Sequence, residues 1–312
     1  SFHEASMPGL LQLQVGVVVA VIVFAVLFAR SRRGQTWDVG KLPAPWGDRP
    51  SIYAHVKSHL PPSGAGLTAG GEELPDEDRF SPDGAIRWAP GARDGVLGHH
   101  VGATDQGLAA TEVVDAIRDV TRLPSAQALK GAYELLSDEK ALAGVDPVLE
   151  AVLARKDLDL ERLRSFARWV VTGAPDRTAV KIGLALLGIF RGEADRDLFL
   201  TLGRHDEFTL FSAVALQNSL ADPDPALFEL AKSVDGWGRI QTVERLKTTK
   251  DPGVKRWMLR EGYKNSVMYE YLAHLCAMVG GLRSEIEASE VDDAVRKAAA
   301  EVQAGSQGRV QV

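Results

Sequence analysis

Cysteine is nearly absent from this sequence: Cys276 is the single thiol among 312 residues. One thiol cannot form an internal disulfide, so the fold does not depend on disulfide bonds and nothing requires an oxidising compartment. Positive charge is also scarce, because 36 Lys and Arg stand against 42 Asp and Glu and leave a formal net charge of −6. This acidic balance argues against nucleic acid as the partner, since nucleic-acid-binding domains are usually basic.

Several catalytic and cofactor-binding motifs are missing as well. The sequence contains no phosphate-binding loop, no dinucleotide fingerprint, no nucleophile elbow and no paired cysteines that would hold zinc. It does contain an ordinary globular mixture of 45% hydrophobic and 25% charged residues, enough for one large domain or two small ones. We therefore assign no catalytic residue, metal or cofactor, and we expect a folded protein without enzymatic activity.

Charge is absent from one block near the N-terminus. Residues 10–29 read LLQLQVGVVVAVIVFAVLFA, and a helix of about 20 residues spans about 30 Å, the thickness of a bilayer's hydrocarbon core. No Lys or Arg precedes the block, whereas three arginines follow it directly: Arg30, Arg32 and Arg33. The positive-inside rule then predicts a single-pass transmembrane helix over residues 10–30, with residues 1–9 outside the cell and the main domain in the cytoplasm.

A cleaved signal peptide is the alternative for this block. It needs a basic start and a small-residue cleavage site, and both are absent. Arg outnumbers Lys by 24 to 12, and Ala, Val and Gly are plentiful, as in proteins of GC-rich bacteria. We therefore expect the protein in the inner membrane of a bacterium, in contact with the bilayer through residues 10–29.

Proline and glycine are concentrated directly after this block, where eight of the 15 prolines lie. Such a composition favours loops over helices. We expect residues 31–50 to be a linker and residues 51–105 to be an irregular region packed on the domain that follows. Residues 51–60, bounded by Pro50 and Pro61, are predicted to form a short helix.

Residues 106–304 have the apolar spacing of helices, and four segments in this range align with each other. Their starts are about 30 residues apart, and a leucine follows each start by ten residues. Positions four, seven and ten residues after a start share one stripe of a helix, which predicts a buried face. The starts are Asp176, Asp206, Gly236 and Asn265, and the leucines are Leu186, Leu216, Leu246 and Leu275.

Shorter helices are predicted between these segments, beginning where Asp precedes Pro. The carboxylate caps free N–H groups, and a proline in the first turn removes a donor that has no partner. The three places are Asp146-Pro147, Asp222-Pro223 and Asp251-Pro252. Residues 305–312 are expected to be a flexible tail.

The short period, the Asp-Pro starts and the leucine of the second helix resemble the short variety of HEAT-like repeats. The resemblance covers roughly residues 146–281, and it departs from the family because the typical Val and Arg positions are not regular here. It implies an all-α solenoid of helix pairs after the transmembrane helix. It also implies that the protein binds another macromolecule through a concave surface, without identifying which one.

A local excess of positive charge lies at residues 236–264, where eight basic residues stand against three acidic ones among interleaved aromatic rings. Such a face suits phosphates, an acidic partner or the anionic inner leaflet, and Gly236-Trp237-Gly238 at a helix start would offer bare N–H groups to an anion. Alternatively, the tryptophans are core anchors and the basic residues a solvated face. The candidates for partner or anion binding are Trp237, Arg239, Arg245, Lys255, Arg256 and Arg260.

Three other features favour structural interpretations. His55 and His59 share a helix face but are too few for a tight metal site. Cys276 lies in an apolar helix two residues from His274, so we expect a buried, inert thiol. The acidic stretch ELPDEDRF lacks the ligand spacing of a calcium loop and is expected to be a solvated loop.

Together these observations predict a membrane-anchored cytoplasmic scaffold that binds a cytoplasmic or membrane protein and catalyses no reaction. The alternative is a HEAT-like-repeat enzyme, or a nucleic-acid-binding protein, that uses the basic and aromatic face at residues 236–264.

Overall fold

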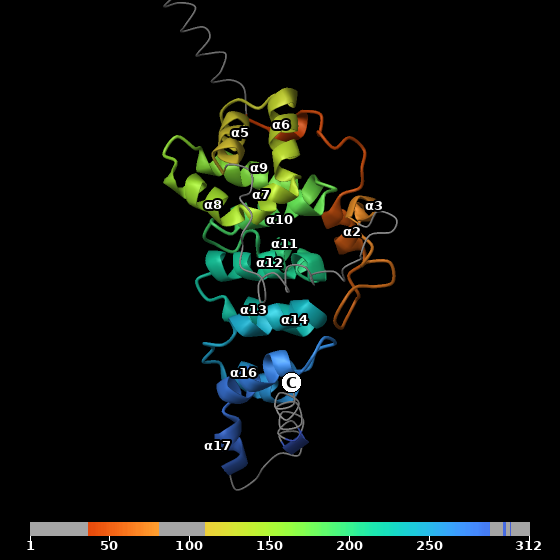
Figure 1. The fold of residues 1–312 in the computed structure, drawn as a ribbon, viewed down its shortest axis with the longest axis vertical. Helices are drawn as coiled ribbons and strands as arrows, with labels where there is room; N and C mark the ends of the chain where they lie inside the picture. The colour runs from red at the N-terminus through yellow and green to blue at the C-terminus, as the bar shows by residue number, and fades with distance from the viewer. Residues whose placement is uncertain (1–36, 81–109, 288–295, 298–299, 301–312) are drawn as a thin grey trace, which may run out of the picture. The chain divides into compact units, whose positions relative to one another are not determined.

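The computed structural model describes residues 37–80, 110–287, 296–297 and 300. The regular structure in these ranges is helical throughout, with no strand among them, which confirms the predicted all-α class for this part of the chain. The chain divides into two units, residues 1–41 and residues 42–312. The first unit has one described element, a 3-10 turn, and the helices α2 to α17 belong to the second (Figure 1).

The second unit contains helices of 4 to 14 residues, with a π-helical turn, η2, directly after α15. Their bounds are α2 (Ile52–Ser58), α3 (Glu77–Phe80), α5 (Ala110–Arg122), α6 (Ala126–Leu136), α7 (Glu139–Ala143), α8 (Val145–Ala154), α9 (Leu160–Gly173), α10 (Arg177–Leu187), α11 (Arg196–Leu202), α12 (Asp206–Ser219), α13 (Asp224–Ser233), α14 (Gly236–Arg245), α15 (Pro252–Trp257), η2 (Met258–Gly262), α16 (Glu270–Gly280) and α17 (Leu282–Glu287).

Two rows of helices run through this unit. In one row α10, α12, α14 and α16 follow one another, each in contact with the next. The second row holds α11, α13 and α15, and each of these contacts the helix of the first row that follows it in the chain: α11 with α12, α13 with α14, and α15 with α16. Helices α11 and α15 are shorter than their partners, whereas α13 and α14 both have 10 residues. Figure 1 shows these pairs succeeding one another from green to blue.

The leucines predicted to be buried lie in the interior of the long row. Leu186, Leu216 and Leu246 have no exposed surface. The 30-residue period therefore reflects burial of one stripe per long helix.

Close approach of α9 and α10 depends on Gly183, because a Cβ at this position would lie 2.6 Å from Val171 Cγ2.

The fourth long helix begins later than predicted. Asn265 does not start a helix: its Oδ1 accepts from the amides of Val267 and Met268, both at 2.9 Å, and so closes a turn. Helix α16 begins at Glu270. The shift leaves Leu275 only partly buried, and Cys276 takes the buried position beside it.

The Asp-Pro signals predict helix starts well. Asp251 caps α15 by accepting from the Val254 amide at 2.8 Å. Helix α13 begins directly after Pro223. Asp146 differs slightly, because it lies in the first turn of α8 instead of preceding it.

Helix α2, which matches the short helix predicted at residues 51–60, contacts both α9 and α11. Ser51 Oγ donates to the Thr172 carbonyl at 2.6 Å, and the Ile52 amide donates to the Ala174 carbonyl at 3.1 Å. The N-terminal part of this unit is thus packed on helices more than 100 residues further along the chain.

Several predictions fall outside the described residues. These are the transmembrane helix at residues 10–30, the second part of the irregular region at 81–105, and the tail at 305–312. Among the described helices, none has the length and apolar character that a bilayer span requires. The predicted domain boundaries stay predictions.

Candidate functional site

Arg239, a predicted anion-binding residue, holds main-chain carbonyls instead. Its Nε donates to the Val234 carbonyl at 2.9 Å, and its Nη1 lies 3.4 Å from the carbonyl of Glu261 and 3.3 Å from that of Lys264. The guanidinium also lies 5.4 Å from the centre of the Trp257 ring. Burial lowers the pKa of Arg239. This side chain therefore ties the start of α14 to the turn after η2.

Arg245 and Arg260 are also poor candidates for an open anion site. Arg245 Nη1 donates to the Gln241 carbonyl of its own helix at 2.7 Å, and burial lowers the pKa of Arg245. Arg260 lies partly buried within η2. Both arginines are partly buried, with their Nε atoms shielded from solvent, whereas the charge count alone predicts exposed side chains.

The aromatic rings mostly join helices to each other. Trp237 is partly buried with its ring centre 5.2 Å from that of Tyr271, which links α14 to α16. Trp257 packs edge-on against Phe228 of α13 at 5.2 Å. This agrees with the interpretation of the tryptophans as anchors.

Positive charge does remain open at the connection from α14 to α15. Three of its basic side chains are exposed and one is partly exposed, and none forms an ion pair with a described carboxylate. The neighbouring Asp251 carboxylate is engaged as the cap of α15. We call these four residues the basic patch: Lys247, Lys250, Lys255 and Arg256.

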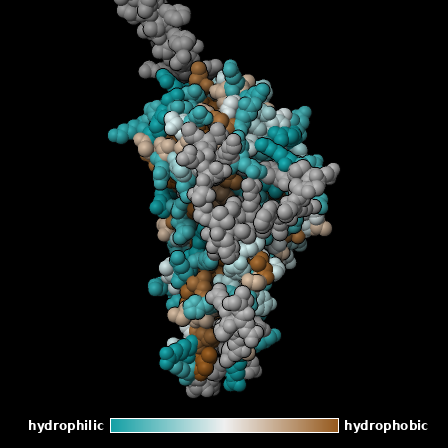
Figure 2. All heavy atoms as spheres, in the orientation of Figure 1, coloured by the Kyte–Doolittle hydropathy of each residue, from teal (hydrophilic) through white to brown (hydrophobic). Residues whose placement is uncertain are grey.

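Large apolar side chains are exposed on the last helices and on the segment directly before α16. A Cβ on Gly280 would lie 3.1 Å from the Lys255 carbonyl oxygen, so α15 and the end of α16 are in direct contact. Figure 2 shows brown apolar side chains over the lower part of this face, where α16 and α17 lie. The exposed residues here are Met268, Tyr269, Met278 and Ile286.

The start of α14 holds a carboxyl group of the chain itself. The Gly238 amide is hydrogen-bonded to Asp206, the first residue of α12. A Cβ on Gly238 would lie 2.7 Å from Asp206 Oδ1. A Cβ on Gly236 would lie 3.1 Å from Asp206 Oδ2, and the φ of Gly236 is +53°. The sequence predicts room for an anion at these glycines, and the structure fills that room with Asp206.

Asp206 has an unusual charge state. Burial raises the pKa of its carboxyl to about 8, and the nearby carboxylates of Glu72, Asp235 and Glu207 add to the shift. The carboxyl is therefore mostly protonated at neutral pH. No sequence signal indicates this, because Glu72 lies far away along the chain and is brought close only by the fold.

His205, the residue before α12, remains uncharged at neutral pH. Its Nε2 lies 3.3 Å from the Glu72 carbonyl oxygen, and its Nδ1 accepts from the Glu207 amide at 3.1 Å. Burial lowers the pKa of His205 to about 4. The neutral ring thus joins the segment around residue 72 to the start of α12.

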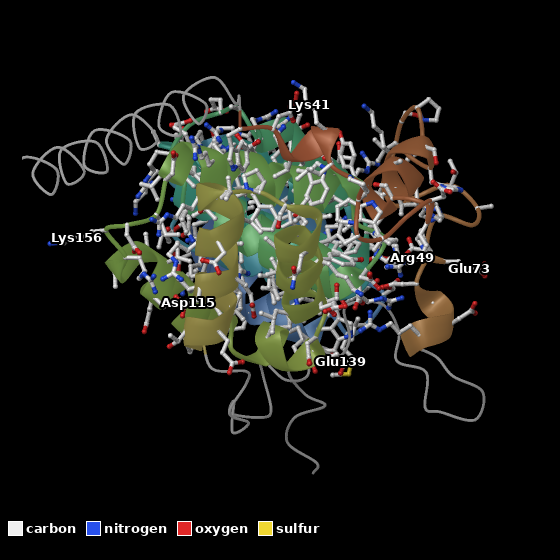
Figure 3. The ribbon with its side chains drawn as sticks, turned by 90° about the horizontal axis from the view of Figure 1, so that it is seen from above. Lys41, Arg49, Glu73, Asp115, Glu139 and Lys156 are labelled. Atoms are coloured by element: carbon white, nitrogen blue, oxygen red, sulfur yellow. The ribbon has the colours of Figure 1, made fainter. Side chains whose placement is uncertain are left out.

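The acidic stretch predicted as a solvated loop is partly buried. Asp76 accepts from the Arg177 amide at 2.7 Å and from its guanidinium at 3.0 Å, and Glu77 accepts from the same guanidinium at 2.8 Å. The prediction is wrong for these two residues because Arg177, at the start of α10, binds both carboxylates. Figure 3 shows Arg49 and Glu73 on the same side of the unit, beside this segment.

The other sequence features have structural roles. Cys276 is buried, as predicted, and burial raises the pKa of its thiol to about 12. His55 Nε2 lies 3.2 Å from the Gly71 carbonyl oxygen and His59 Nδ1 lies 2.8 Å from that of His55. Within the described ranges, no three His, Cys, Asp or Glu side chains are grouped to hold a metal ion.

Comparison with known proteins gives no relative: no family model matches the chain, and no curated protein or solved structure matches it either.

Proposed function

We propose that this protein is a membrane-anchored scaffold whose cytoplasmic helical domain binds an acidic, amphipathic segment of a protein partner. The observation that carries the proposal is the basic patch, whose four side chains form no ion pair with a carboxylate in the described part of a chain of net charge −6. Exposed apolar side chains lie on α16 and α17, and the end of α16 contacts α15, which carries Lys255 and Arg256. A partner segment with carboxylates on one side and apolar residues on the other complements both features.

The physical basis of the interaction is twofold. Uncompensated positive charge attracts an acidic segment and accelerates encounter, while burial of the apolar side chains supplies the affinity. The anchor predicted at residues 10–30 would confine the domain to the membrane surface and raise its effective concentration towards partners there.

We further propose that the two rows form a short-period, HEAT-like solenoid. Support comes from helix pairs that follow one another at about 30 residues and from the three buried leucines that recur with this period, Leu186, Leu216 and Leu246. The alternative enzyme or nucleic-acid function uses the basic and aromatic face at residues 236–264, which includes Arg239 and Arg245. Both guanidiniums donate to main-chain carbonyls, so we do not propose that function.

Crosslinking in native membranes tests the proposed partner site. The full chain is compared with a variant that carries Lys255→Glu and Arg256→Glu. The control variant carries Lys130→Glu, which reverses the charge of an exposed side chain on α6. We expect a crosslinked protein, attached through an acidic segment, that is lost with the double reversal and kept with Lys130→Glu. Equal recovery from all three chains would refute the site.

The anchor is tested separately by deleting residues 1–34. We expect this chain to leave the membrane fraction and to lose the crosslinked protein. If the truncated chain stays in the membrane fraction, the anchor at residues 10–30 is wrong, whatever the result for the basic patch.

A further inference from the structure

Residues 60–74 form a strap across the ends of α11 and α13, and several of their contacts are made by the main chain. The Gly66 amide donates to the Ser233 carbonyl at 2.9 Å, which satisfies a free carbonyl at the end of α13. Arg204, after α11, donates through Nη2 to the Gly64 carbonyl, and the same nitrogen lies 3.4 Å from the Gly66 carbonyl oxygen. Both glycines have positive φ, +92° and +76°, a backbone conformation that other residues rarely adopt.

The strap lies over a groove between α11 and α13. A cavity of about 230 Å³ remains there, lined by Leu60 of the strap and by Leu200, Arg204 and Leu230 of the helices, among others. Burial lowers the pKa of Arg204, and its Nε is buried without a hydrogen bond. Arg204 therefore depends on the strap for its described acceptors. Departure of the strap would uncover a groove of mixed character, in which Leu200 and Leu230 lie beside Arg204, Thr201, Asp197 and Glu229.

The far end of the strap is held at the start of α12. The Glu72 carbonyl oxygen lies 3.3 Å from His205 Nε2, and the Glu72 carboxylate oxygen lies 3.6 Å from the same nitrogen. Close by is the Asp206 carboxyl, packed against Gly236 and Gly238. Three carboxylates raise the pKa of Asp206 by electrostatic repulsion: Glu72 on the strap, Asp235 before α14 and Glu207 on α12.

We propose that the strap is a pH-sensitive latch, closed over the groove between α11 and α13 while the Asp206 carboxyl carries its proton and released when that carboxyl ionises. Ionisation places a third negative charge between Glu72 and Asp235 in a mostly buried position. Asp235 accepts from the Ser266 amide at 3.0 Å, whereas Glu72 lies on the strap with its side chain 55% exposed, so the added repulsion acts to move Glu72 away from the start of α12. The strap is held by main-chain hydrogen bonds and by the buried side chain of Leu74, and its release requires these contacts to break.

The sign of the pH dependence follows from the two groups at this end. The pKa of Asp206 is raised to about 8 in the closed form, so opening is favoured as pH rises from the ordinary carboxyl value towards 8. The pKa of His205 is lowered to about 4, and Arg177 and His55 add positive charge near it, so opening is also favoured as pH falls below the ordinary histidine value of 6.5. The two effects oppose each other between pH 4 and 6.5. Only the Asp206 effect remains between pH 6.5 and 8.

Hydrogen exchange on the full chain tests the latch. After correction for the intrinsic rate, the protection of amides in residues 60–74 should fall about tenfold per pH unit between pH 6.5 and 8, and then level off. Asp206→Asn keeps the shape and an oxygen acceptor for Gly238 but cannot ionise. Its strap should show flat protection across the same range.

Two further variants make the outcome decisive. Glu72→Gln should weaken the pH dependence, and Asp222→Asn, which changes an exposed carboxylate before α13, should leave it as in the parent chain. Amides of α10 report on the global fold in every sample. Flat protection in the parent chain, or the same fall in Asp206→Asn as in the parent, would overturn the proposal.

Discussion

Asp176 is the buried acceptor that joins the N-terminal segment of the second unit to its helices, and its removal is our main prediction. The side chain is 1% exposed and precedes α10. Arg49 Nη2 donates to it at 3.0 Å and Arg79 Nη1 at 2.8 Å, and the Tyr133 hydroxyl donates to Oδ2. Asp176→Ala would leave three donors without this acceptor.

The expected cost follows from how exposed these donors are. Both arginines are 51% exposed, so water can replace the carboxylate for them and each pair contributes little. Tyr133 is buried, and an unsatisfied buried hydroxyl costs about 1–3 kcal/mol. We therefore expect Asp176→Ala to lower the free energy of unfolding by about 2–3 kcal/mol, less than the loss of one partner of a fully buried ion pair. Asp176→Asn keeps an acceptor for Tyr133 and should cost about 1 kcal/mol.

Urea unfolding of the purified full chain in detergent measures these values, with tryptophan fluorescence as the signal. Trp46 is a suitable reporter because its ring packs against Tyr133 and Trp169 at 5.0 and 4.4 Å between centres. Asp222→Ala serves as the control, with an expected change within about 0.5 kcal/mol. The reasoning is refuted if Asp176→Ala unfolds at the same urea concentration as this control.

Three further predictions concern single side chains. Gly183→Ala should destabilise by about 1–3 kcal/mol in thermal unfolding, because its methyl group would meet Val171 at 2.6 Å, and an unchanged melting temperature would contradict the tight contact of α9 with α10. The Cys276 thiol, with its pKa raised to about 12, should react with a thiol reagent at pH 8 only after denaturation, and reaction of the native chain would show that it is accessible. Arg239→Ala should lower the free energy of unfolding in urea by about 2 kcal/mol without loss of the partner proposed to bind the basic patch. Loss of the partner from a folded Arg239→Ala chain would restore Arg239 as a binding residue.

The helices and their spacing follow from the sequence because the signals are local. A leucine every 30 residues marks the buried stripe, and Asp before Pro supplies the cap, as Asp251 does for α15. The start of α16 is mispredicted because Asn265 closes a turn with its own neighbours, which interrupts the period. A local side-chain hydrogen bond of this kind competes with a helix start and leaves no periodic signal.

The site depends on contacts between distant segments. Counting charges identifies an excess at residues 236–264. Only the tertiary structure shows that Arg239 binds carbonyls up to 25 residues away, whereas Lys255 and Arg256 remain accessible to solvent. It also brings Glu72 to Asp206 and so shifts the pKa of that carboxyl. The sequence by itself determined the helical class, the period and the excess charge, because propensity, caps and composition act within a few residues. The tertiary structure decided which charges are buried, paired or open, because desolvation and Coulomb interactions depend on distance in space.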